Sequence, residues 1–256
     1  MYETTKVLSN EKICSGVYSM VLQTDKIADA SAPGQFVMLK GWEGNEPFLM
    51  RPFSINTADS EKGTITFLYK VVGDGTKKMA GLQHGDAVRL LGPLGNGFPI
   101  DGGYKYAAVV GRGIGIAPMR FLVERLTAQD TIVYAYLSAK NEDFLFHKEL
   151  FEKLGAVVRT TTDPTVRVTS FLERDVEIIP FDAAYSCGSN RLAQDLKQLH
   201  EKIGLTAYVS LEEHMACGVG ACKGCTHTAY DPVTGESFYV RVCKEGPVFP
   251  VERVVG

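Results

Sequence analysis

Four cysteines near the C-terminus constrain this chain more than any other feature. Cys217, Cys222 and Cys225 lie within nine residues, and seventeen residues separate the third from Cys243. A C-x4-C-x2-C loop with a distant fourth cysteine is the spacing that holds a [2Fe–2S] cluster. The loop is rich in glycine, which lets the backbone fold tightly and direct N–H groups at sulfur. The pattern therefore predicts an iron–sulfur site that transfers single electrons.

Other uses of clustered cysteines fit this spacing less well. Structural zinc sites more often have two separated pairs, whereas here the fourth cysteine stands alone on a strand-like segment, 238–243. Disulfides are typical of secreted chains, and the N-terminus has no apolar signal segment. His214 and His227 flank the loop, but no second Cys/His pair with Rieske spacing follows. Both histidines are expected on the surface, and zinc or disulfides stay as alternatives.

Composition limits the partners and the compartment. The 256-residue chain has 45% hydrophobic residues, 22% charged residues and a net charge of −3. This balance gives no electrostatic basis for binding nucleic acid or an anionic membrane. No hydrophobic run reaches the length of a membrane-spanning helix. A thiol-rich site without an export signal predicts a reducing, cytoplasmic location.

The pattern of strand-like, helix-like and turn segments divides the chain into three expected domains. Residues 1–100 contain short strand-like segments separated by turns, for example 12–22, which predicts a small antiparallel β-barrel. Residues 101–209 alternate strand-like and helix-like segments, which predicts a parallel sheet with crossover helices. Residues 210–256 form the cysteine module. The expected fold class is therefore α/β plus β.

Two motifs in the first domain favour phosphate binding. Segment 51–54 reads Arg-Pro-Phe-Ser and follows a strand-like segment, 47–50. The planar guanidinium group of arginine can form two parallel hydrogen bonds to a phosphate. Alone this motif is weak, because a solvated arginine is the ordinary alternative. Segment 70–76 runs from a strand through two glycines into a helical turn, where backbone N–H groups attract anions. Together the two motifs predict a phosphate-bearing ligand.

Glycines in the second domain favour a nucleotide. Gly111, Gly113 and Gly115 follow a strand-like segment and precede a helix-like one, although they do not form G-x-G-x-x-G. A packing turn is the alternative. Cys187 and Gly188 end a later strand, so they share the carboxyl edge of the sheet, where ligands bind in open α/β sheets. A lone cysteine there is otherwise a small buried residue.

The motifs, taken in this order, resemble the ferredoxin-reductase-like flavoproteins. Within that superfamily the chain looks most like the electron-transfer, iron–sulfur flavoprotein subunit of the NAD-linked class 1B dihydroorotate dehydrogenases. The cysteine loop, 215–225, and the ending Val-Cys-Lys-Glu-Gly-Pro-Val-Phe, 242–249, are the most specific parts. The resemblance covers essentially the full chain.

The resemblance implies three sites. FAD would be held by Arg51, Pro52, Phe53, Ser54, Leu68, Tyr69, Lys70, Gly75 and Thr76. A [2Fe–2S] cluster would be held by Cys217, Cys222, Cys225 and Cys243. NAD(H) would lie near Gly111, Gly113, Gly115, Cys187 and Gly188, with Cys187 close to flavin and nicotinamide.

The resemblance also implies a partner and a pathway. A catalytic subunit carrying FMN would oxidise dihydroorotate in pyrimidine biosynthesis, and electrons would pass through the cluster and FAD to NAD+. The assembly would be a 2+2 heterotetramer. One alternative is a reductase subunit of another complex, of the NADH-dependent ferredoxin:NADP oxidoreductase or sulfhydrogenase type. A zinc-stabilised binding module without cofactor chemistry is the other.

Three departures from the family pattern surround the nucleotide site. Arg112 stands where a second glycine is usual, Ser189 replaces a proline, and the segment after Asp163 is short. Arg112 or Arg167 would suit a 2′-phosphate, so NAD, NADP and a site that no longer uses nicotinamide all stay open at this point.

Overall fold

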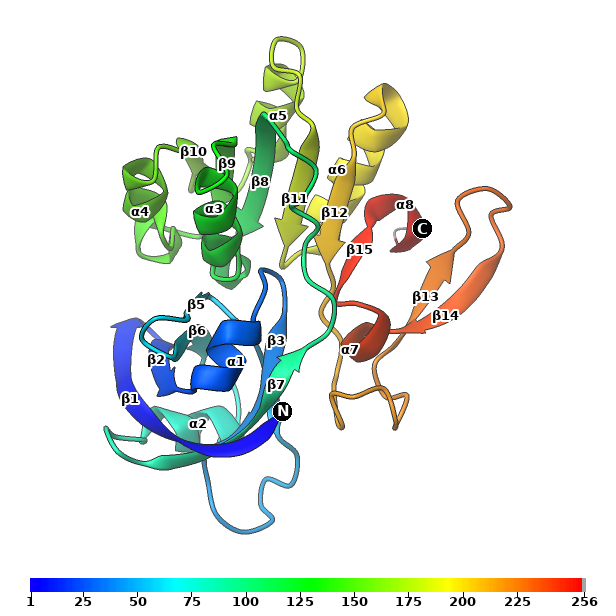
Figure 1. The fold of residues 1–256 in the computed structure, drawn as a ribbon. Helices are drawn as coiled ribbons and strands as arrows, with labels where there is room; N and C mark the ends of the chain where they lie inside the picture. Colours follow the sequence, from blue (N-terminus) through cyan, green and yellow to red (C-terminus); the bar gives the residue numbers. More distant parts are fainter. Residues whose placement is uncertain (255–256) are drawn as a thin grey trace.

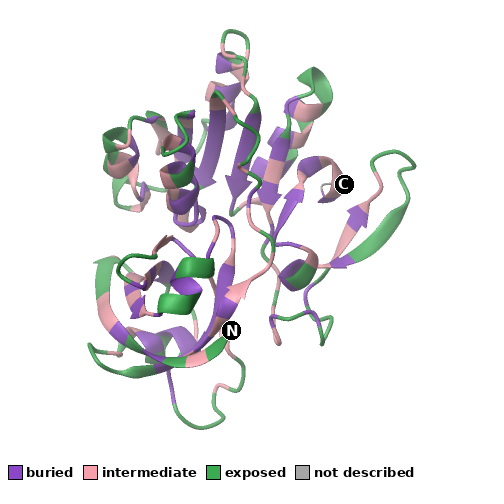
Figure 2. Cartoon of the chain, viewed as in Figure 1, coloured by how far each residue is buried: buried purple, intermediate pink, exposed green. Residues whose placement is uncertain are grey.

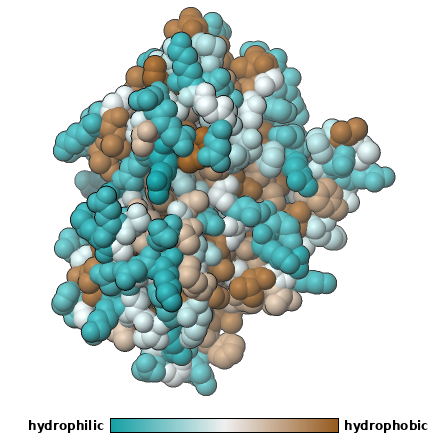
Figure 3. Space-filling model, in the orientation of Figure 1, coloured by the Kyte–Doolittle hydropathy of each residue, from teal (hydrophilic) through white to brown (hydrophobic). Residues whose placement is uncertain are grey.

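The computed structural model describes residues 1–254, which form two large β-sheets and a C-terminal extension that carries a two-stranded sheet (Figure 1). The N-terminal sheet lies below the α/β sheet in this view, and the extension lies beside both. Within the described residues, no helix is long and apolar enough to cross a membrane. On the face drawn in Figure 3, hydrophilic and hydrophobic residues are interspersed.

The N-terminal domain is an antiparallel sheet of seven strands, as predicted, in the order β4-β3-β7-β1-β2-β6-β5. The sheet curls so that β4 and β6, near its opposite ends, come together. Phe53 on β4 stacks on Phe67 of β6 with ring centroids 5.0 Å apart. The strands are β1 (Tyr2–Cys14), β2 (Val17–Gln23), β3 (Phe36–Lys40), β4 (Arg51–Ser54), β5 (Thr57–Asp59), β6 (Thr64–Lys70) and β7 (Ala87–Leu94). Two short helices accompany them, α1 (Asp25–Ala30) and α2 (Asp74–Ala80).

Two expected strands in this domain are wrong in detail. Segment 12–22 is not one strand, because the chain reverses at Gly16, whose φ of +74° favours glycine. Segment 47–50 is not a strand either, and the strand β4 instead begins at Arg51 itself. The arginine motif therefore lies within the sheet and has its position fixed by β3, with which β4 pairs.

The second sheet has the order β10-β9-β8-β11-β12-β15, and its first five strands are parallel, as predicted. These strands are β8 (Tyr106–Arg112), β9 (Ile132–Ser138), β10 (Val157–Thr161), β11 (Ala183–Cys187) and β12 (Ala207–Ser210). The helical segments between them are η1 (Gly113–Ile116), α3 (Met119–Thr127), η2 (Glu142–Phe144), α4 (Lys148–Lys153), α5 (Thr169–Asp175) and α6 (Asn190–Ile203).

Alternation along β8 explains how helices cover both faces of this sheet. Ala107 and Val109 pack with α3 and α4 on one face, whereas Ala108 and Val110 pack with α5 and α6 on the other. All four side chains are fully buried, which is typical of a central parallel strand. Figure 2 shows the same central strands as the most buried part of the molecule.

The C-terminal extension belongs partly to the α/β sheet. It comprises β13 (Thr226–Tyr230), β14 (Ser237–Arg241), α7 (Val242–Glu245), β15 (Val248–Pro250) and α8 (Val251–Val254). Strand β15 pairs antiparallel with β12 and so adds an edge strand that the sequence did not reveal. The β13–β14 hairpin projects to the side (Figure 1). Cys243 lies in α7, so the strand predicted over 238–243 is wrong for its last two residues.

Candidate functional site

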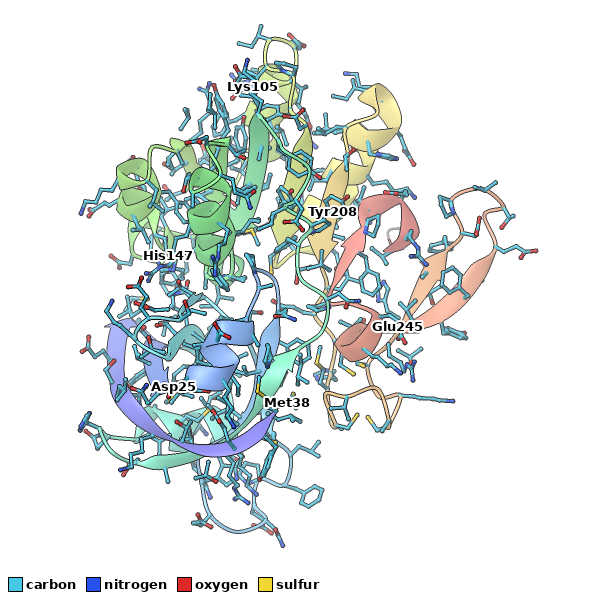
Figure 4. The ribbon with its side chains drawn as sticks, viewed as in Figure 1. Asp25, Met38, Lys105, His147, Tyr208 and Glu245 are labelled. Carbon is cyan, nitrogen blue, oxygen red and sulfur yellow. The ribbon has the colours of Figure 1, made fainter. Side chains whose placement is uncertain are left out.

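The four cysteines come together in the C-terminal extension, where it faces the N-terminal sheet. Three lie in the cluster loop, residues 215–225, and Figure 4 shows sulfur atoms gathered at this loop beneath α7. The loop packs against β3, because a Cβ atom on Gly218 would lie 2.6 Å from the Cγ of Met38. Gly218 also has a φ of +72°, so this close approach needs glycine.

Each cysteine sulfur accepts one backbone N–H group. The N···Sγ distances are 3.1 Å from Gly220 to Cys243, and 3.4 Å from Cys222 to Cys217, from Gly224 to Cys222 and from Cys243 to Cys225. Donors directed at sulfur stabilise the negative charge of thiolates and of a bound iron–sulfur cluster. The four residues therefore fit a [2Fe–2S] cluster in their chemistry and in their surroundings.

The set has a buried and an exposed side. Cys225 and Cys243 are 1% and 3% exposed, whereas Cys217 is half-buried and Cys222 is exposed. Burial raises the pKa of Cys243 to about 12, while the N–H group of Cys222 lowers the pKa of Cys217 to about 6. A bound metal deprotonates its thiol ligands, so a metal would offset the effect of burial on Cys243.

The histidines near the loop have other roles. In residues 1–254, no three His, Cys, Asp or Glu side chains are arranged around one point as ligands of a single ion. A [2Fe–2S] centre does not need such a point, because its cysteines are shared between two irons. His214 is exposed, as expected, but His227 is half-buried, with Nδ1 3.0 Å from Glu213 and Nε2 3.2 Å from the carbonyl of Val254.

A first cavity, of about 400 Å³, lies where the N-terminal sheet, the η1 turn and the extension meet. Six residues predicted for FAD line it: Pro52, Phe53, Ser54, Leu68, Tyr69 and Lys70. The sequence reasoning missed Met215 and Pro247 from the extension and Pro118 after the η1 turn. No local signal marks these residues, because only the folded chain places them at one cavity.

Arg51, Gly75 and Thr76 lie outside that lining but close to one another. A Cβ atom on Gly75 would lie 3.2 Å from the Nε of Arg51 and 3.1 Å from the ring of Trp42. The Arg51 guanidinium also lies over the Trp42 ring, 5.7 Å from its centroid. The two predicted phosphate motifs therefore meet in space, and the absence of a side chain on Gly75 lets the Arg51 guanidinium lie against it.

Thr76 shapes this corner with its hydroxyl group. Its Oγ1 accepts N–H groups from Val72 and Gly73, at 2.9 and 3.1 Å, and donates to the carbonyl of Gly73 at 3.0 Å. The side chain is 7% exposed. Its hydroxyl therefore orders the turn before α2.

A second cavity, of about 540 Å³, lies at the carboxyl edge of the parallel sheet. Gly113 and Arg112 line it, together with residues that follow β9 and β10. Lys70 and Ile114 line both this cavity and the first one. The two cavities are therefore neighbours, and groups bound in them can approach each other.

The other glycines predicted for the nucleotide site allow two turns to pack closely. A Cβ atom on Gly115 would lie 2.6 Å from the carbonyl oxygen of Cys187, and one on Gly188 would lie 2.7 Å from the Cα of Gly115. Gly111 is equally confined, because its Cβ would lie 2.9 Å from Ile116. These glycines allow the turns after β8 and β11 to pack closely, while Gly113 faces the cavity.

Cys187 lies behind this contact rather than in either larger cavity. It is 3% exposed and lines a smaller cavity, of about 280 Å³, with Ser210 and Glu212. Burial, together with the smaller effect of the Glu212 carboxylate, raises the pKa of the Cys187 thiol to about 12. The thiol is therefore protonated at neutral pH and is not a ready nucleophile.

Of the two cations considered for a 2′-phosphate, Arg167 already has carboxylate partners. Its guanidinium lies 2.8 Å from Glu173 and 3.0 Å from Asp195. Arg112 is exposed at the cavity wall. Asp163 lines the same cavity, and hydrogen bonds from Thr165 hold the pKa of its carboxyl below the usual value.

Comparison with known families agrees with both halves of the site. Residues 212–255 match the family described as the iron–sulfur cluster binding domain of dihydroorotate dehydrogenase B. Residues 4–98 match the oxidoreductase FAD-binding domain. The chain is 39% identical over 254 residues to the dihydroorotate dehydrogenase B (NAD(+)) electron transfer subunits of Bacillus mycoides KBAB4 and Bacillus cereus Q1. The match covers 97% of this chain and 96% of each relative.

Solved structures share the fold. An NADH-dependent reduced ferredoxin-NADP oxidoreductase, described for flavin-based electron bifurcation, superposes with a TM-score of 0.84 at 25% identity. It covers 98% of this chain and 89% of its own. Phthalate dioxygenase reductase superposes with a TM-score of 0.62 at 20% identity, over 95% of this chain and 77% of its own.

Proposed function

The chain belongs to the electron transfer subunits of dihydroorotate dehydrogenase B, and we propose that it connects a catalytic partner subunit to NAD through a [2Fe–2S] cluster and FAD. The observation that carries this proposal is the shared wall between the sites. Met215 lines the first cavity and lies two residues before Cys217. When bound, the cluster supplies one-electron transfer and FAD joins it to the two-electron chemistry of nicotinamide.

We assign the first cavity to the flavin ring. Ser54 and Lys70 supply polar groups at its wall, and Phe53 and Leu68 supply apolar contacts. Arg51 beside Gly75 supplies a planar cation for the FAD pyrophosphate. Apolar residues at the cavity and a cation beside it suit a ligand with an apolar ring at one end and phosphates in the middle.

We assign the second cavity to NAD. Lys70 and Ile114 lie between it and the flavin cavity, so a nicotinamide there can reach the flavin. Arg167 is held by Glu173 and Asp195 and so is less suited to a 2′-phosphate. The Asp163 carboxylate at the same wall suits a ribose hydroxyl and repels a phosphate. These features favour NAD over NADP.

The exposed side of the cysteine set indicates where the partner approaches. Cys222 is the exposed member, whereas Cys225 and Cys243 are buried. An electron donor that cannot enter the protein therefore meets the set at Cys222. The proposed donor is a catalytic subunit with FMN that oxidises dihydroorotate in pyrimidine biosynthesis. We propose a cytoplasmic assembly of two copies of each subunit.

The Cys222→Ser variant tests this order of sites. We expect the visible and EPR signals of the cluster to be lost and FAD to remain bound. NADH should still reduce FAD, while NAD reduction by dihydroorotate and the partner subunit should stop. Cys14→Ser, at a half-buried cysteine on β1, is the matched control and should keep every signal. A fully loaded cluster in Cys222→Ser would show that the ligand assignment is wrong.

A second candidate is a reductase subunit of a different complex. The TM-score of 0.84 to an NADH-dependent reduced ferredoxin-NADP oxidoreductase favours it. Co-purification separates the two candidates. A co-purified FMN enzyme that reduces NAD with dihydroorotate supports the first, and a large multi-cluster flavoprotein supports the second.

A further inference from the structure

Arg241 makes an unusual set of contacts beside the cysteines. It is the last residue of β14, directly before the helix α7 that carries Cys243. Its Nη1 donates to the carbonyl oxygen of Gly220 in the cluster loop, at 3.0 Å. Gly220 in turn donates its own N–H to the Sγ of Cys243, at 3.1 Å. This N···Sγ distance is shorter than the other three in the set.

Glu245 fixes the position of this guanidinium. One carboxylate oxygen, Oε2, accepts both the backbone N–H of Arg241 at 2.7 Å and its Nε at 3.1 Å. The other oxygen, Oε1, accepts from Nη2. The guanidinium is thus held by a two-pronged carboxylate contact, which leaves Nη1 directed at Gly220. Figure 4 labels Glu245 on α7, directly above the cluster loop.

Gly220 depends on such support. Its φ of +80° is available to few residues besides glycine, and a Cβ atom would lie 2.7 Å from the Lys244 side chain. A backbone with this freedom keeps a fixed N–H direction only where its neighbours hold it. Arg241 holds the carbonyl of the same residue whose N–H reaches the sulfur.

We propose that Arg241 is a positioning residue of the iron–sulfur site, which holds Gly220 so that its N–H stays on the Cys243 sulfur. The inference rests on the proposed function, since it requires a cluster on these cysteines. An N–H···S bond and a nearby cation both stabilise the more negative, reduced state. Arg241 therefore raises the reduction potential of the site and makes it a better electron acceptor.

The test is a potentiometric titration of the purified protein, followed by EPR and absorbance, with iron content measured in parallel. R241Q removes the charge and the fork and leaves a shorter, neutral amide. We expect R241Q to retain iron and to have a lower midpoint potential by about 59 mV, which is a tenfold change in the one-electron equilibrium constant. A purely structural role would instead lower iron content and leave the potential of the loaded fraction unchanged, which would overturn the proposal.

Two variants separate positioning from charge. R241K keeps the charge without the fork, so we expect a smaller shift in the same direction. K223Q removes an equal charge from the same loop, while Arg241 still holds Gly220, so we expect a smaller shift than for R241Q. A wild-type potential in R241K, or a shift in K223Q as large as in R241Q, would show that charge alone acts and would overturn positioning.

E245D covers the case in which R241Q does not retain a cluster. It keeps both charges but shortens the carboxylate arm that holds the guanidinium, so the potential should fall. An unchanged potential in E245D, together with cluster loss in R241Q, would overturn the proposal. Wild-type protein purified without iron would overturn the proposed function itself. Wild-type protein that contains iron, together with variants whose midpoint potentials are unchanged, would overturn only this inference.

Discussion

The iron–sulfur site and the flavin site are built in opposite ways. Three of the four cysteines lie within nine residues of the cluster loop, and their N–H donors come from the same loop and from α7. The cavity that we assign to the flavin is instead lined by the N-terminal sheet, the turn after β8 and the extension. A locally built site is visible in a sequence, and a site built from distant segments is visible only in part.

This difference predicts that the two sites fail separately. Loss of a cysteine should remove the cluster alone, and loss of a flavin contact should remove FAD alone. Their independence has a limit, because Gly218 packs on Met38 of β3 and joins the cluster loop to the FAD-binding domain. Substitutions on each side measure how far the separation holds.

The largest effect is expected from Arg51→Gln. It removes the cation proposed for the FAD pyrophosphate, and charge-assisted hydrogen bonds contribute about 1.5–3 kcal/mol. FAD affinity should fall roughly 10- to 100-fold, with the cluster signal retained. Fluorescence titration of deflavinated protein with FAD measures this. Lys62→Gln, at an exposed residue paired with Asp59, is the control, and equal FAD binding in R51Q and wild type would remove Arg51 from the site.

A smaller effect is expected from Gly115→Ala. The added Cβ would lie 2.6 Å from the backbone oxygen of Cys187, so the turns after β8 and β11 must separate. Overpacking of this kind costs about 1–3 kcal/mol of unfolding free energy. NADH should reduce FAD more slowly, because the carboxyl edge of the parallel sheet, where we place NAD, is displaced. The reduction potential of the cluster should stay the same.

Gly81→Ala is the matched control for that variant. Gly81 has a φ of −87°, and an added Cβ would meet only the carbonyl of Lys78 at an ordinary 3.5 Å. Urea unfolding and stopped-flow reduction should both match wild type. A Gly115→Ala protein that also matched wild type would show that the two turns do not need their close contact.

The smallest effect concerns acid stability of the α/β domain. Burial, together with a smaller effect of nearby Arg120, lowers the pKa of His147 to about 3, against about 6.5 in an unfolded chain. The unfolded state thus binds an extra proton between these values, and stability falls as pH falls below about 6.5. The loss should reach about 1.4 kcal/mol one pH unit lower.

His147→Asn should flatten this pH dependence, because asparagine tolerates the φ of +64° and does not titrate there. His84→Asn, at an exposed histidine, should keep the wild-type slope. Urea unfolding of cofactor-free protein between pH 5 and 8 measures both. An unchanged slope in His147→Asn would assign the acid sensitivity to other groups.

The sequence predicted the main elements of both domains well. Alternating segments gave the antiparallel sheet, and strand–helix alternation gave the parallel sheet with crossover helices. It placed Cys243 on a strand, although α7 begins at Val242, because a short helix after β14 leaves too few residues for a helical period. It also gave no sign that β15 would complete the α/β sheet.

The sequence by itself determined the cysteine set and the turns that need glycine, because those features depend on spacing along a few residues. Only the tertiary structure decided that Gly115 and Gly188 touch, that Arg51 lies beside Gly75, and that Met215 reaches the flavin cavity. Such contacts join residues far apart in the chain. They depend on how whole sheets and loops pack, and no local pattern of residue types specifies that packing.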